Sequence, residues 1–77
     1  MEFPKFVRRL GPKSCFKTEA CPDVILLSDG SFAIIGLDIT AQSKGNLPEG
    51  TGCGESERVV RIPRQTLLQA IADIGKA

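Results

Sequence analysis

Histidine, tryptophan and tyrosine are all absent from the 77 residues, and the missing histidine narrows the chemistry most. Histidine is the commonest general base and metal ligand, and its side chain titrates near neutral pH. The three cysteines include no Cys-x-x-Cys pair, so a tetrahedral zinc site would need a carboxylate or a ligand from another chain. We therefore expect no metal ion and no other cofactor.

Long apolar runs are missing too. The two longest stretches, residues 24–27 and 32–37, are separated by polar turn residues, whereas a helix that crosses a bilayer needs about 20 apolar residues. The first ten residues contain no apolar run of signal-peptide length. The sequence therefore predicts a soluble, cytoplasmic protein that does not contact a membrane.

Cysteine is scarce and its count is odd, with Cys15, Cys21 and Cys53. Secreted domains of this length that depend on disulfides usually carry an even number of cysteines. In a reducing cytoplasm we expect free thiols, and a Cys15–Cys21 disulfide is the alternative.

Net charge is small, because ten Lys and Arg residues oppose nine Asp and Glu residues and leave +1. The charge is nevertheless uneven, since residues 1–18 carry +4 and the remainder carries −3. Three phenylalanines, Phe3, Phe6 and Phe16, are interleaved with the basic residues of this amino-terminal arm. We expect the basic side chains to form a charged rim beside an interface. They are Lys5, Arg8, Arg9, Lys13 and Lys17.

What the sequence does contain fits one small domain, because 77 residues are too few for two cores. Asp29-Gly30 between two aliphatic runs favours a hairpin, and Pro63 with a later Gly75 predicts a helix between them. We expect an α+β fold, with a small antiparallel three-stranded sheet and one carboxy-terminal helix. The expected order is a basic irregular arm (1–22), a β-hairpin (23–37), a glycine-rich loop (38–56), a strand (57–62) and a helix (63–74).

A two-residue type I′ turn at Asp29-Gly30 would decide which hairpin residues share a face. Leu27 then lies opposite Phe32, and Ile25 lies opposite Ile34. Both faces become apolar, whereas an antiparallel sheet with one wet face alternates apolar and polar residues. In the helix, the one-sided apolar stripe consists of Leu67, Leu68, Ile71 and Ile74. The residues expected to face water are Arg64, Gln65, Gln69 and Asp73.

One short helix covers only one face of such a hairpin. Leaving four or five large aliphatic side chains in water would forfeit about 5–10 kcal/mol, which is comparable to the whole stability of a small domain. We therefore expect the second face to be covered by the arm or loop of the chain itself, by another protein, or by a second copy in a homodimer. The candidate interface residues are Val24, Ile25, Leu26, Leu27, Phe32, Ile34, Ile35 and Leu37.

These features predict a non-enzymatic protein–protein interaction module. Gly52-Cys53-Gly54 resembles an exposed nucleophile on a glycine turn, but no histidine is present to activate the thiol. The alternative is nucleic-acid binding by the arm, whose basic residues would contact phosphates while its phenylalanines stack on bases.

Three segments resemble a group of small actinomycete proteins that are commonly encoded beside helix-turn-helix regulators. They are Cys21-Pro-Asp-Val24, Asp29-Gly-Ser-Phe-Ala-Ile-Ile-Gly36 and Glu57-Arg-Val-Val-Arg-Ile-Pro-Arg64. The hairpin alone is also similar to a short regulator-associated family with two strands before a carboxy-terminal helix. The resemblance implies a cytoplasmic accessory or antitoxin-like partner of a bacterial transcriptional regulator, and it carries no catalytic motif.

Overall fold

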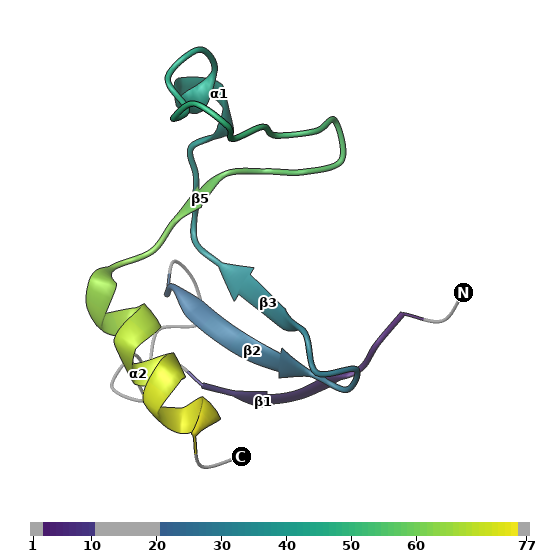
Figure 1. Ribbon diagram of the computed structural model, residues 1–77. Coiled ribbons are helices and arrows are strands. Elements are labelled where there is room, and N and C mark those ends of the chain that lie inside the picture. Colours follow the sequence, from purple (N-terminus) through teal and green to yellow (C-terminus); the bar gives the residue numbers. More distant parts are fainter. Residues whose placement is uncertain (1–2, 11–20, 76–77) are drawn as a thin grey trace.

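A three-stranded antiparallel sheet forms the centre of the fold in a computed structural model, which describes residues 3–10 and 21–75. Its strands are β1 (Phe6–Arg9), β2 (Asp23–Leu27) and β3 (Phe32–Ile35), in the order β1-β2-β3. A carboxy-terminal helix, α2 (Arg64–Ile74), crosses one end of the sheet (Figure 1). The predicted α+β fold is confirmed, but β1 from the arm supplies the third strand in place of residues 57–62.

The hairpin between β2 and β3 has a three-residue turn, so the predicted register is wrong by one residue. Leu26 pairs with Phe32 and Val24 pairs with Ile34. The amide of Leu27 donates to the carbonyl oxygen of Ser31 at 2.9 Å, and Gly30 adopts a positive φ of 88°. This pattern is typical of a turn that ends in a glycine bulge, which a two-residue type I′ turn does not allow.

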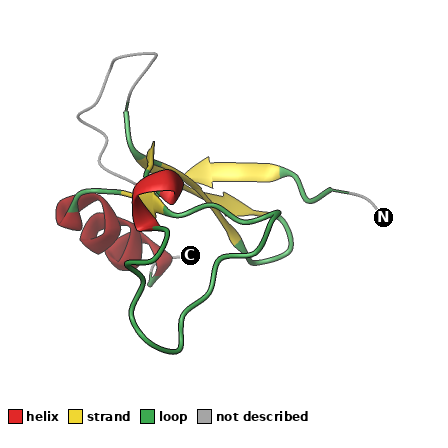
Figure 2. Ribbon diagram, turned by 90° about the horizontal axis from the view of Figure 1, so that it is seen from above, coloured by secondary structure: helices red, strands yellow, loops and turns green. Residues whose placement is uncertain are grey.

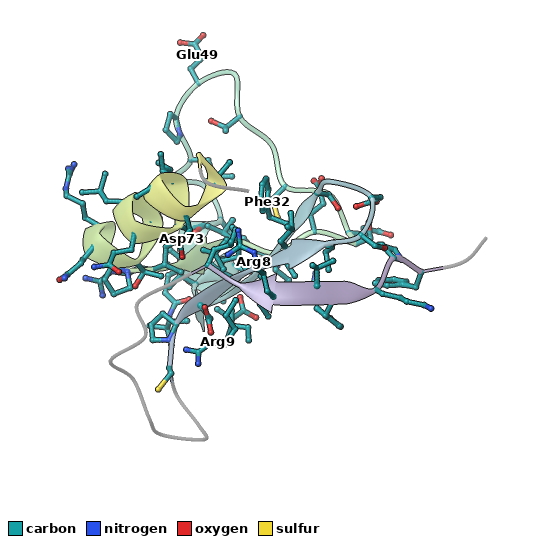
Figure 3. All side chains as sticks on the ribbon, turned by 90° about the horizontal axis from the view of Figure 1, so that it is seen from below. Arg8, Arg9, Phe32, Glu49 and Asp73 are labelled. Atoms are coloured by element: carbon teal, nitrogen blue, oxygen red, sulfur yellow. The ribbon has the colours of Figure 1, made fainter. Side chains whose placement is uncertain are left out.

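The shift by one residue exchanges the partners across each face of the hairpin. The face toward α2 now carries Val24 and Leu26 with Phe32 and Ile34. The opposite face carries Ile25 and Leu27 with Ala33 and Ile35. Figure 3 agrees, since Phe32 lies on the same side of the sheet as α2.

A second ladder continues from the end of β3. β4 (Leu37–Asp38) pairs with β5 (Val60–Arg61), so only two residues of the predicted strand 57–62 are extended and paired. The segment between them forms a long excursion that begins with one helical turn, α1 (Thr40–Ser43), and extends away from the three-stranded sheet (Figures 1 and 2). The expected glycine-rich loop is therefore mostly irregular, and its single helical turn was not predicted.

Helix α2 has nearly the predicted bounds but a different orientation. Thr66 and Ala70 are its buried residues, whereas Leu67, Ile71 and the rest of the predicted stripe are exposed. The prediction that the apolar stripe faces the sheet is therefore wrong. Small side chains at Thr66 and Ala70 let the helix approach the sheet closely, where Ala70 joins a core cluster.

Among the described residues, the buried apolar side chains are Leu10, Val24, Leu27 and Ala70. Leu10, Val24 and Ala70 form one cluster, against which Leu26 and Ile62 pack. Leu10 is held beside β2 by its amide, which donates to the carbonyl oxygen of Val24 at 2.7 Å. This cluster joins the arm, the hairpin and α2.

The structure also shows the state of two cysteines and whether a described helix could cross a membrane. Cys21 is disulfide-bonded, so the expectation of a free thiol is wrong at this position, while Cys53 is free and exposed as expected. Cys15, which the sequence offers as the partner of Cys21, lies outside the described residues. No helix within residues 3–10 and 21–75 is long and apolar enough to cross a membrane.

Candidate interaction surfaces

The eight candidate interface residues separate into two groups by exposure. In β2, Val24 and Leu27 are buried while Ile25 and Leu26 are half-buried, so this strand supplies the interior of the domain. The residues that follow the turn stay accessible: Phe32 is 42%, Ile34 45%, Ile35 52% and Leu37 63% exposed. The accessible part of the predicted interface is therefore the segment from β3 to β4.

Exposed apolar residues of α2 lie on the same side of the sheet as Phe32 and Ile34 of β3. With 100° of rotation per residue, Leu67, Ile71 and Ile74 fall about a quarter turn from the buried line through Thr66 and Ala70. The helix begins near β5 and ends over β1 (Figure 1), where Arg8 Nη2 donates to the carbonyl oxygen of Asp73.

Because α2 is right-handed and runs from β5 toward β1, the flank that carries Leu67, Ile71 and Ile74 faces along the sheet toward the β2–β3 turn. This flank is on the side of the sheet where Phe32 lies (Figures 1 and 3). We name the combined area the helix–sheet surface. It consists of Phe32, Ile34, Leu67, Ile71 and Ile74, each between 40% and 54% exposed. The apolar stripe of α2 can be identified from the sequence. The direction in which the stripe points depends on how the helix docks on the sheet.

A groove opens where β3 meets β4. We name it the Gly36 groove; its volume is about 560 Å³. Ile35, Leu37, Ile62 and Pro63 give it apolar walls, and Arg61 and Arg64 are among the lining residues. The remaining lining residues are Cys21, Pro22 and Gly36.

The basic side chains of this groove come close to Ile35 and Leu37 because β4 pairs with β5. Arg61 is a strand residue and Arg64 is the first residue of α2. Neither forms an ion pair with a carboxylate within the described part of the chain. The groove therefore combines an apolar lining with positive charge, which suits a segment that carries an acidic residue beside an apolar one.

The predicted basic rim is partly engaged within the fold. Arg9 Nε forms an ion pair with Asp23 Oδ2, and Asp23 is 6% exposed. The other oxygen of Asp23 accepts from the amide of Val24 at 2.9 Å. Arg8 lies on the helix side and Arg9 on the opposite side (Figure 3). Lys5 is exposed on the segment before β1, and Lys13 and Lys17 lie outside the described residues.

The base of the long excursion is closed by Thr40. Its Oγ1 donates to Asp38 Oδ1 at 2.6 Å and accepts from the amide of Val59 at 2.9 Å. The bonds from the Thr40 hydroxyl and amide hold the pKa of Asp38 below its ordinary value of 3.8. The tip of the excursion, where Glu49 lies (Figure 3), is exposed.

Cys53 lines a cavity of about 660 Å³ within this excursion. The thiol contacts the carbonyl oxygen of Gly54 at 3.9 Å, and the carboxylate of Glu57 accepts from the amide of Gly54 at 2.7 Å. Arg58 donates to the carbonyl oxygens of Glu55 and Glu57. The side chains of Glu57 and Arg58 bond to backbone groups of the turn. They therefore stabilise the turn that shapes the cavity.

Metal ligands do not gather in the structure as far as it is described: residues 3–10 and 21–75 contain no group of three or more Cys, Asp or Glu side chains that could hold a metal ion. Comparison with known proteins finds no matching family model and no significant match among curated proteins or solved structures.

Proposed function

We propose that the chain is a small, non-enzymatic regulatory interaction module, which acts as an accessory or antitoxin-like partner of a bacterial transcriptional regulator. The observation that carries this proposal is the exposure of Ile35 and Leu37 in the Gly36 groove, which Arg61 and Arg64 also line. Exposed apolar areas that polar residues border are typical of interaction sites. A transcriptional regulator as the partner is supported by the resemblance of the hairpin and of residues 57–64 to small actinomycete proteins that are encoded beside regulators.

Covering the Gly36 groove is favourable for the chain. Burying the exposed halves of Ile35 and Leu37 contributes about 2–3 kcal/mol. The total stability of a small domain is about 5–15 kcal/mol. Coverage of these two side chains by another protein is therefore a substantial gain relative to what holds the chain folded.

The Gly36 groove is the docking site that this proposal assigns to the regulator. Ile35 and Leu37 supply the apolar contacts, and Arg61 and Arg64 supply the positive charge. The matching segment on the regulator carries an apolar side chain next to an acidic residue. Because charge at the rim acts mainly on the association rate, salt is expected to slow association more than it speeds dissociation.

The experiment is affinity purification of the tagged chain from its native cells, in three forms. The wild-type chain is expected to recover a helix-turn-helix regulator, Ile35→Asp is expected to lose it, and Gln69→Asp, at an exposed position of α2, serves as the control. Circular dichroism of each form shows that the fold is retained. Recovery of the same regulator by Ile35→Asp would contradict the assigned groove.

A titration with DNA at two salt concentrations separates this function from nucleic-acid binding. Phosphate contacts make affinity fall steeply as salt rises. The proposal predicts no binding by the isolated chain beyond weak non-specific attraction. Tight binding that is abolished by Lys5→Ala together with Arg8→Ala would instead favour a nucleic-acid function.

A further inference from the structure

We propose that the helix–sheet surface binds a second copy of this chain, so that the module is a two-fold symmetric dimer. This inference deepens the proposed function, because the dimer would present two Gly36 grooves to a regulator. The apolar residues on the flank of α2 follow each other at intervals of four and three, from Leu67 to Ile71 to Ile74.

That spacing is self-complementary. In a two-fold interface, residue i of one copy contacts residue j of the other, and j contacts i in return. When two α2 helices run antiparallel across the axis, Leu67 of one copy meets Ile74 of the other, and Ile71 lies near the axis. Intervals of three and four are also those of a packed helix seam. The antiparallel arrangement in addition sets the positive end of each helix dipole beside the negative end of the other.

The β3 residues on the same side extend the seam. Phe32 and Ile34 are 42% and 45% exposed, so they are available to contact the partner helix as it crosses the sheet. Aromatic residues near the centre of an interface contribute a large share of its binding energy. Five partly exposed apolar residues at roughly 90 Å² each give about 450 Å² of apolar area. A partner in a standard interface contributes about 800 Å², of which 56–65% is apolar.

A second copy is the occupant to which these observations point, rather than the regulator. The helix flank matches itself under two-fold rotation, while the described part of the flank carries no cluster of like charge that would favour a charged partner. Association also stabilises the folded chain by mass action, and a second copy is always present.

The test begins with sedimentation equilibrium of the wild-type chain. The expected mass is twice 8.3 kDa. Ile71→Asp places a charge near the two-fold axis on a residue that is 54% exposed, so the fold tolerates it while the dimer does not. We expect the dimer dissociation constant to rise about a hundredfold or more, because each change occurs twice in the interface. Gln69→Asp, on the polar flank of the same helix, is the matched control and is expected to leave the constant unchanged.

Cross-linking supplies a second readout that does not depend on tolerance of a charge. In a Cys53→Ser background, Ile71→Cys is expected to form a covalent dimer under mild oxidation, and Gln69→Cys is expected to remain monomeric. A wild-type chain that is monomeric at about 100 µM, where even a weak dimer with a micromolar constant is formed, would overturn the inference. So would a dimer that Ile71→Asp leaves intact.

Failure of the dimer leaves the proposed function separately testable. Ile34 and Ile35 are adjacent but point to opposite faces of β3. Ile34→Asp is expected to weaken the dimer, and Ile35→Asp is expected to lose the regulator without weakening the dimer. A monomeric chain that still recovers a regulator through Ile35 would overturn the dimer alone. A dimer that recovers no regulator would overturn the proposed function alone.

Discussion

Gly36 lies directly against the backbone of Arg61. A Cβ atom at Gly36 would be 2.7 Å from the carbonyl oxygen of Arg61 and 2.7 Å from Cγ2 of Ile62. The contact joins the three-stranded sheet to the β4–β5 ladder, because Gly36 is the residue between β3 and β4. The floor of the Gly36 groove therefore depends on the absence of a side chain.

Gly36→Ala is expected to destabilise the chain by about 1–3 kcal/mol, because the added methyl group must displace backbone rather than a flexible side chain. Urea denaturation measures the change. Gly52→Ala is the control, since nothing lies within 4 Å of a Cβ atom at that position. Equal stabilities for the two variants would contradict the close packing of Gly36.

The orientation of α2 predicts a contrast between two alanines of one helix. Ala70 is 1% exposed and joins the core cluster, whereas Ala72 is exposed. Ala70→Leu is expected to cost about 1–3 kcal/mol through overpacking, and Ala72→Leu to change stability by less than about 0.5 kcal/mol. Thermal unfolding of both variants provides the comparison. The opposite ranking would restore the orientation in which the apolar stripe faces the sheet.

The ion pair between Arg9 and Asp23 predicts a stability loss at the edge of the sheet. The Asp23 side chain is 8% exposed while that of Arg9 is 51% exposed, so solvent weakens the pair from one side only. Arg9→Ala leaves a buried carboxylate with the amide of Val24 as a partner, and is expected to cost about 1–2 kcal/mol. Arg8→Ala, which loses only a bond of 3.5 Å to the Asp73 carbonyl oxygen, is expected to cost less. Chemical denaturation of both variants measures the difference.

The hydrogen bonds from Thr40 to Asp38 predict how the pKa of Asp38 responds to substitution. The Thr40 hydroxyl is the largest cause of its depression below 3.8, followed by the Thr40 amide. Thr40→Val is therefore expected to raise the pKa of Asp38 toward 3.8, while Thr40→Ser keeps the hydroxyl and the depression. Carbon-detected NMR titration of the carboxyl groups measures both. An unchanged pKa in Thr40→Val would exclude the hydroxyl as the cause.

The sign of the pH dependence follows from the same shift. A carboxyl group whose pKa is lower in the folded chain than in the unfolded chain stabilises the fold above the unfolded value. That contribution is lost as pH falls through the folded pKa. Stability is therefore expected to be insensitive to Asp38 at neutral pH and to decrease only below its ordinary value of 3.8.

Local patterns predicted the elements of this fold better than their arrangement. The aliphatic runs around Asp29-Gly30 and the Pro63-to-Gly75 segment produce a hairpin and a helix at nearly the expected positions. The turn length was wrong because Asp-Gly also suits a three-residue turn, in which only the glycine needs a positive φ. The extra turn residue shifts the register by one, so each β2 residue pairs with a different β3 residue from the one expected.

The helix–sheet surface and the Gly36 groove depend on contacts between segments that are far apart in the sequence. No local sequence pattern predicts such contacts. The core requires Leu10 from the arm and Ala70 from the helix to meet at Val24, across 60 residues of sequence. Once Ala70 occupies that contact, the helix is rotated and its apolar stripe becomes a surface. The Gly36 groove likewise requires β4 to pair with β5, which brings Arg61 beside Leu37.

Concentration dependence of thermal unfolding tests the central claim most directly, namely that this fold is completed by a second protein molecule. When association and folding are linked, the midpoint temperature rises with protein concentration. We predict a rise of about 5–10 °C for a hundredfold increase in the concentration of the wild-type chain, and a smaller rise for Ile71→Asp. A midpoint that stays constant over that range, together with a mass of 8.3 kDa, would contradict the account.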